Sequence, residues 1–256
     1  KLLLVINNTG NASDTKFAVA ISDDNWVTTQ WVQSDNTIGS ALGIEDYQTY
    51  VNWGSGTGEN IIGLSPNTTY WVRVKAFQGE FSETGLGPQA SAATSAVTIS
   101  FDIDVSSIDE ETASPYSVSM GDLTAGSVTT ATNKIWVDLS TNAEYGGSVY
   151  VYDSNAGLAS SSTAYTISSS TANLASVGEG FGLRVNSASN MSSVSPYDGA
   201  SDNVGVVSST IRSIFTSATP ITSGRGSIFV KAKASVTTPA AGDYTDVLTL
   251  IASGTF

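Results

Sequence analysis

Cysteine and histidine are both absent from this sequence of 256 residues. Without them, Ser-His-Asp and Cys-His nucleophilic sites, an imidazole proton shuttle and zinc sites of the ordinary kind are excluded. Disulfide bonds are excluded as well, but the redox compartment stays open, because exported bacterial proteins and cytosolic proteins both avoid cysteine. These two absences exclude more classes of function than any motif supplies.

Positive charge is scarce: the chain has 10 Lys and Arg residues against 23 Asp and Glu residues, and its net charge is −13. No cluster of basic residues exists to neutralise phosphates, so we expect neither a nucleic-acid partner nor docking on an anionic membrane. No apolar run approaches the roughly 20 residues that span a bilayer, so we expect no membrane insertion. No signal-peptide pattern is present, and if the protein is exported, its signal has already been removed.

Most of the polarity comes from serine, threonine, asparagine and 24 glycines, since only 13% of residues are charged while 40% are hydrophobic. Such a neutral, hydroxyl-rich composition is more typical of secreted β-proteins than of cytosolic enzymes. We therefore expect an extracellular or cell-surface location, with the signal peptide already removed.

Alternation of apolar and polar residues dominates the chain, and no stretch keeps a helical period with caps. In "YWVRVKA", Tyr70 and every second residue after it share one face, and Trp71 begins the other. In "VTISFDIDV", the residues from Val97 onward alternate in the same way, with Asp102 and Asp104 on the polar face. Shorter patterns of this kind occur in "KIWVDL", "GSVYVYD", "GFGLRV", "GSIFVKAKA" and "YTDVLTLIA". These patterns predict half-buried antiparallel strands.

Short strands separated by Gly, Asn and Ser predict an all-β fold of two tandem antiparallel β-sandwiches. The run of small residues "GPQASAATSA" indicates a boundary near residue 96. We expect a first domain over residues 1–95 and a larger one over residues 96–256. In the second domain, "SSSTAYTISSSTANLAS" and "NSASNMSSVSPYDGASDNVG" are interpreted as long surface loops.

The stretch "GLSPNTTYWVRVKA" contains Leu64, Pro66, Asn67, Thr68, Tyr70, Val72, Val74 and Ala76. These residues resemble the turn and tyrosine-bearing strand of a fibronectin type III module, and the resemblance covers residues 1 to about 95. It implies an Ig-like sandwich in which a buried Tyr70 hydrogen-bonds back across its corner. In the same alignment, residues 2–6 are the second strand, and the family's first strand has no counterpart.

The missing first strand leaves two interpretations open. Either residues upstream of Lys1 complete the fold, or a neighbouring molecule supplies the strand. An uncovered apolar edge would be an aggregation hazard in a free monomer, and donor-strand pairing would satisfy its backbone and fill its groove. On the second interpretation, Leu2, Leu4 and Ile6 form an assembly edge.

The ending "PAAGDYTDVLTLIASGTF" resembles the terminal strand of bacterial spore-coat and fimbrial β-sandwich subunits, which close their sheet at the C-terminus. The stretch "GDLTAGSVTTATNKIWVDLSTNAEYGG" is similar to repeated surface proteins of small uncultured bacteria. The resemblance implies a pilin-like β-sandwich for residues 96–256 and a structural or adhesive role without catalytic motifs.

Acidic residues are candidates for two kinds of chemistry. Two carboxylates suffice for glycoside hydrolysis, but neither Asp23 with Asp24 nor Asp109 with its acidic neighbours is placed opposite another pair. A glycosidase is therefore unsupported. For calcium, the candidate oxygen donors are Asp109, Glu110, Asp198 and Asp202. No spaced Asp-x-Asp-x-Asp-Gly loop occurs, so we expect solvated loops, with neither a metal nor a cofactor.

Aromatic residues gather in the first domain at Trp26, Trp31, Tyr47, Tyr50 and Trp53. They could stack on sugar rings, cap the core or lie in a subunit contact, and Trp71 should face outward as an interface anchor. The candidate interface or ligand aromatics are Trp26, Trp31, Trp53 and Trp71. Sequons of the form Asn-x-Ser/Thr make four residues candidates for glycosylation: Asn7, Asn11, Asn67 and Asn190.

The leading hypothesis is a non-enzymatic, secreted structural subunit whose identical copies polymerise into a pilus-like filament or surface stalk by strand addition. The alternative is a carbohydrate-binding or adhesive accessory region of a larger secreted protein, with cell-surface glycans as partners. A glycoside hydrolase fragment is a third hypothesis, and it would require a turnover that disappears when one carboxylate is replaced.

Overall fold

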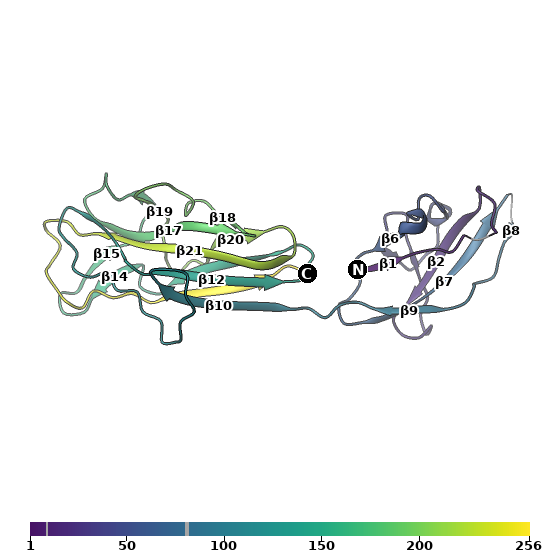
Figure 1. The fold of residues 1–256 in the computed structure, drawn as a ribbon, viewed down its shortest axis with the longest axis horizontal. Coiled ribbons are helices and arrows are strands. Elements are labelled where there is room, and N and C mark those ends of the chain that lie inside the picture. The colour runs from purple at the N-terminus through teal and green to yellow at the C-terminus, as the bar shows by residue number, and fades with distance from the viewer. Residues whose placement is uncertain (9, 80–81) are drawn as a thin grey trace. The chain divides into compact units, whose positions relative to one another are not determined.

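The computed structural model describes residues 1–8, 10–79 and 82–256 and confirms the predicted all-β class (Figure 1). The chain divides into two compact units, Lys1–Val97 and Thr98–Phe256, here called unit 1 and unit 2. The helices of the described chain are two single turns of 3-10 helix, η1 (Ile44–Asp46) and η2 (Ser55–Thr57). Within the same residues, no helix has the length and apolar character needed to cross a membrane.

Unit 1 contains two antiparallel sheets. The smaller one pairs β1 (Leu2–Leu4) with β6 (Glu59–Ile61). The larger one has the strand order β4-β3-β2-β7-β8, with β5 also paired to β2 and β9 also paired to β7. Its strands are β2 (Lys16–Ser22), β3 (Gln30–Val32), β4 (Ile38–Gly39), β5 (Gln48–Thr49), β7 (Thr69–Gln78), β8 (Ser82–Glu83) and β9 (Ala90–Ala93).

The core of unit 1 joins the two sheets, because alternate residues of each one meet in a single buried cluster. The cluster consists of Leu4, Ile6, Phe17, Val19, Ile21, Val32, Trp53, Ile61 and Tyr70. Tyr70 is only 2% exposed, and its hydroxyl accepts a hydrogen bond from the backbone amide of Ser65 at 2.9 Å. The predicted hydrogen bond across this corner is therefore present.

Unit 2 contains two larger sheets and two short strand pairs. The five-stranded sheet consists of β10 (Ile99–Ser106), β11 (Val128–Thr130), β12 (Lys134–Thr141), β17 (Gly180–Ser189) and β21 (Ile221–Lys233). The four-stranded sheet has the order β18 (Ser192–Ser193), β20 (Arg212–Ser217), β13 (Gly147–Asp153) and β22 (Leu248–Gly254). The short pairs are β14 (Gly157–Ser160) with β15 (Tyr165–Ser168), and β16 (Ala172–Asn173) with β19 (Asn203–Val204).

Strict alternation explains why β12 and β13 form the two sides of the core of unit 2. Every second residue of β12 is buried, as Val137 and Leu139 are, and the same holds for Val149 and Val151 of β13. These residues belong to one buried cluster that takes side chains from both large sheets. At the rims, β10 pairs only with β12 and β22 pairs only with β13 within the described chain.

The prediction that two polar stretches form long surface loops is wrong, because both contain strands and buried side chains. The first contains β15 and β16 and buries Ile167 and Leu174 completely. The second contains the end of β17 and the strand β18, and it buries Tyr197. The Tyr197 hydroxyl donates to the carbonyl of Val206 at 2.7 Å, so a polar stretch can cross the core where its few large side chains point inward.

Candidate functional site

The predicted assembly edge lies at β1, which pairs only with β6 within the described chain. Leu4 and Ile6 are 8% and 4% exposed and belong to the core of unit 1, while Leu2 is half-buried against it. The strand ends at Leu4, so it is shorter than the predicted strand over residues 2–6. Side chains that already lie in the core do not line an open groove, and this corrects the expected geometry of the edge.

The outward residues of the same segment are apolar as well. Leu3 is 61% exposed and Val5 is 53% exposed, because alternation turns them away from the core. The second edge of β1 has no strand paired to it within the described residues. The part of this segment that is open to a partner is thus its backbone edge together with Leu3 and Val5.

Trp53 was expected among the interface or ligand aromatics, and the structure contradicts this. Its side chain is fully buried, and the indole Nε1 donates to the carbonyl of Phe17 at 3.0 Å. A buried indole needs such an acceptor, because an unpaired N–H in the core costs free energy. Trp53 is therefore a core residue of unit 1.

Trp26 and Trp31 are half-buried and are each stacked against a cation of β7. The Arg73 guanidinium carbon lies 4.6 Å from the Trp26 ring centroid, and Lys75 Nζ lies 4.9 Å from that of Trp31. Trp26 Nε1 also donates to Gln89 Oε1 at 2.6 Å. Cation–π contacts of this kind contribute about 0.5–1 kcal/mol at exposed sites. One face of each ring is already covered, so the two indoles do not form a bare platform for sugars.

The stack continues around Lys75, which is the cross-strand partner of the fully buried Ala18. Lys75 Nζ lies 2.6 Å from Glu83 Oε1 and 5.4 Å from the Tyr47 ring centroid, and the Tyr47 hydroxyl donates to Glu83. Burial lowers the pKa of Lys75. Trp71 is half-buried on the same strand, opposite Ser22 and Ser91, and its role as an interface anchor stays a prediction.

The four sequon asparagines are exposed, but they differ in their surroundings. The Asn190 amide donates to the carbonyls of Thr222 and Ser223 at 3.0 and 3.2 Å, and a sugar on this nitrogen would replace one of its two N–H donors. Asn67 lies in a turn, and the backbone amide of Asn11 donates to the carbonyl of Asn8 at 3.2 Å. For Asn7, the sequon residue Thr9 lies outside the described residues. Glycosylation at these positions stays a prediction.

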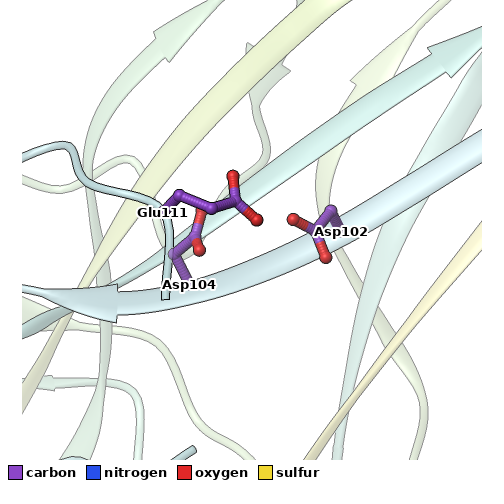
Figure 2. A group of neighbouring side chains, drawn as sticks. All are labelled: Asp102, Asp104 and Glu111. Atoms are coloured by element: carbon purple, nitrogen blue, oxygen red, sulfur yellow. The ribbon is translucent and has the colours of Figure 1, made fainter. Parts of the chain in front are cut away.

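Three carboxylates come together at β10: the alternation predicted that two of them share a face, but it did not predict the third. Asp102 and Asp104 lie two residues apart on one face of the strand, and Glu111 reaches them from the following loop (Figure 2). Carboxylate oxygens of all three lie within 4.8 Å of one another. Asp104 was expected on a solvated face, yet it is fully buried, because the loop folds over it and Thr112 N donates to its carboxylate at 2.7 Å.

A cation already neutralises part of this cluster. Arg225 NH1 lies 3.2 Å from Asp104 Oδ2, and the same guanidinium pairs with Asp109 and Asp138. The charges of Asp104 and Asp102 raise the pKa of Glu111. Burial raises the pKa of Asp138, and the charge of Arg225 offsets part of that effect. The arrangement is an ion-pair network that fastens the loop to the outer face of the sheet.

The calcium donors expected from sequence are not gathered at one place. Asp109 is paired with Arg225, and Asp202 accepts from Lys231 Nζ at 2.8 Å. Among the described residues, the group of three carboxylates that lie close enough to share a metal is Asp102 with Asp104 and Glu111, none of which was expected as a calcium donor. The remaining two candidates, Glu110 and Asp198, are exposed.

Asp24 has a structural role in its turn. Its carboxylate accepts from the hydroxyl and amide of Thr28 and from the Ser22 hydroxyl, and these bonds lower its pKa to about 2. Such bonds favour the ionised carboxylate and hold the turn after β2.

No protein-family model matches the chain, and neither a curated protein nor a solved structure does. The main surface features of the described chain are thus the strand edges that lack a partner strand and the tryptophans that are covered by cations.

Proposed function

We propose that this chain is a non-enzymatic structural subunit of an extracellular filament or surface stalk, in which identical copies join by β-strand addition. One observation carries the proposal: β1 pairs on one side only within the described chain, and it presents the exposed Leu3 and Val5 beside its free backbone edge. An unprotected apolar edge is a template for a further strand.

Two effects stabilise the addition of a strand at β1. The incoming strand satisfies the backbone groups of the free edge, and its side chains cover Leu2 on one face and Leu3 on the other. Each apolar side chain that is fully covered contributes about 1.5–3 kcal/mol. Ordering the incoming strand costs conformational entropy, so this figure is an upper value.

Unit 2 of a neighbouring copy can supply the second edge. β22 pairs only with β13 within the described chain. It carries Ile251, which is 39% exposed, and the residue directly before the strand, Val247, is 62% exposed. A contact between β1 of one copy and β22 of the next joins two different surfaces. Such heterologous contacts produce open chains when the rotation between copies does not close, and this supports a filament.

The finer fold assignment belongs to the same proposal. We propose a fibronectin type III-like sandwich for unit 1 and a pilin-like sandwich for unit 2. The strand order of unit 1 and the hydrogen bond from Ser65 to Tyr70 support the first assignment. On this alignment, the free side of β1 is where the family's first strand would lie.

The carbohydrate-binding alternative relies on Trp26, Trp31 and Trp71, since Trp53 is buried. The partial exposure of these three indoles on unit 1 is the observation that favours it. Binding to a glycan array that is lost in Trp31→Ala, with assembly unchanged, would support this function over the filament.

Electron microscopy of native material, together with the intact mass of its dissociated subunit, tests the filament directly. We expect regular filaments, and we expect the double variant Leu3→Lys with Val5→Lys to remain monomeric, because charge at an edge opposes strand addition. Both side chains are exposed, so the fold tolerates the change. Val27→Lys is the matched control, since Val27 is 85% exposed on the same unit and lies away from β1. Monodisperse wild-type particles, or filaments that persist in the double variant, would contradict the proposal.

A further inference from the structure

Two aspartates of unit 2 stand apart from the acidic cluster on β10. Asp153 is the last residue of β13 and is fully buried. Its Oδ1 accepts from the backbone amide of Asn155 at 2.6 Å. Its Oδ2 is buried and has no hydrogen-bond partner within the described chain. A fully buried carboxylate oxygen without a donor carries a large desolvation cost.

Pairing of β13 with β22 brings the second aspartate to the first. Asp153 lies opposite Leu248, and Asp246 precedes that residue by two positions. The carboxyl group of Asp246 lies beside that of Asp153 and beside the side chain of Asn155. Asp246 Oδ1 accepts from Val247 N at 2.8 Å, while its Oδ2 is buried without a partner. Two orphaned carboxylate oxygens thus share one site.

The negative charge of the two carboxylates is not neutralised by a basic side chain of the described residues. Within the described chain, no lysine or arginine forms an ion pair with either carboxylate. A neighbouring aspartate shows the contrast, since Asp243 accepts four bonds from the serines at positions 160, 161 and 162. The pair therefore requires either a shared proton or a cation.

We propose that Asp153, Asn155 and Asp246 bind a divalent cation, and that Ca²⁺ is the ion that fits their chemistry. All the donors are oxygens, and hard cations with oxygen ligands are bound in this way. The Asp-x-Asn spacing places two donors on one turn, while Asp246 comes from the segment that leads into β22. Asn155 is exposed, so the ion can enter from solvent and keep water ligands. When the ion is bound, the Asn155 amide presents its oxygen to it.

The cluster of Asp102, Asp104 and Glu111 is the weaker candidate for such an ion. There the buried member, Asp104, already receives a charge from Arg225 and a hydrogen bond from Thr112 N. At the pair, by contrast, both free oxygens are buried and unpartnered. An ion there links the turn after β13 to the segment that leads into β22, so its binding stabilises the edge of the four-stranded sheet.

The test uses the full chain, stripped with a chelator and then titrated with CaCl₂ alone at neutral pH. Isothermal titration calorimetry is expected to show one site, and the melting temperature is expected to rise with the logarithm of the Ca²⁺ concentration. The variant Asp246→Asn is expected to lose both effects. In chelator it should melt at or above the wild-type temperature, because the substitution removes the repulsion within the pair. Asn155→Ala is expected to weaken binding without abolishing folding.

Asp102→Asn is the matched control, since it removes one carboxylate from the other cluster and should leave the Ca²⁺ response intact. A wild-type melting temperature that does not respond to millimolar Ca²⁺ would overturn the proposal in favour of a shared proton. A response that disappears in Asp102→Asn and persists in Asp246→Asn would also overturn it, because the ion would then lie at the cluster on β10.

Discussion

The guanidinium of Arg225 reaches three aspartates that come from different parts of unit 2. Asp104 lies on β10, Asp138 lies on β12, and Asp109 lies in the loop that follows β10. The ion pairs with Asp109 and Asp138 are partly solvated. Water screens them, so they contribute little to the free energy of unfolding. The fully buried Asp104 is different, because it loses its main charge partner when Arg225 is removed.

We predict that Arg225→Met destabilises unit 2 by about 3 kcal/mol, since breaking a buried ion pair leaves an uncompensated charge. Urea unfolding followed by circular dichroism measures this change. Combining Arg225→Met with Asp104→Asn should recover part of the loss, because the orphaned charge is then absent. Arg212→Met is the control, since Arg212 is exposed. Equal stability of the Arg225→Met and Arg212→Met variants would show that Asp104 does not depend on the guanidinium.

Individual side chains also show where sequence patterns fail. Tyr70 could be placed because it belongs to a long alternating strand with a recognisable turn before it. Trp53 lies in a turn between short elements, where alternation gives no face, and its burial depends on the distant carbonyl of Phe17. Asp104 follows the polar alternation of β10 faithfully, but a loop covers it, and a pattern along one strand says nothing about what folds over that strand.

At the level of elements, the strongly alternating stretches became strands because apolar residues at every second position need a common buried face. The stretch "GSVYVYD" coincides with β13, and each of the other six predicted stretches overlaps a strand. The prediction of surface loops for the two serine-rich stretches is wrong, because two or three buried residues suffice to bring such a segment into the core. The pairing of Asp153 with Asp246 could not be foreseen, since it requires the register of β13 against β22.

The segment 113–118 has a conformation that strand patterns do not describe. It follows the loop over Asp104, and within the described chain its backbone amides donate no hydrogen bond. Val118 packs against the core of unit 2 and holds the segment in place. The segment is therefore attached by side-chain contacts alone, unlike β12, whose two neighbours satisfy its backbone.

We predict that the amides of residues 113–118 exchange with solvent orders of magnitude faster than those of Ile135, Val137 and Leu139 in β12. Opening of unbonded segments costs little free energy, whereas central strands exchange only by large-scale unfolding. Hydrogen exchange read by mass spectrometry measures both regions in one experiment. Protection of residues 113–118 to the level of β12 would mean that the segment has backbone partners in solution.

At the scale of the whole molecule, the separation of the cores is the main feature. The buried cluster of unit 1 takes all its members from residues 4–70, and that of unit 2 takes all its members from residues 131–234. Each unit therefore has the apolar interior that an independently folding domain needs.

We predict that residues 98–256, produced alone, fold and melt at the temperature of one transition in the full chain. The reason is that the fragment keeps its whole buried cluster. Differential scanning calorimetry of the fragment and of the full chain makes the comparison. A fragment without a cooperative transition would show that unit 2 needs unit 1 to fold.

The order of the strands along the chain also determines which unit can fold first during translation. Unit 1 has every residue of its buried cluster once residue 70 has left the ribosome, because Tyr70 is the last member of that cluster along the chain. In unit 2, β13 must wait for β22, its partner at the rim of the sheet, until residue 254 has been made. Domains generally fold as units, the N-terminal one first. The exposed edge of β1 is therefore formed while the unit that follows it is still being translated.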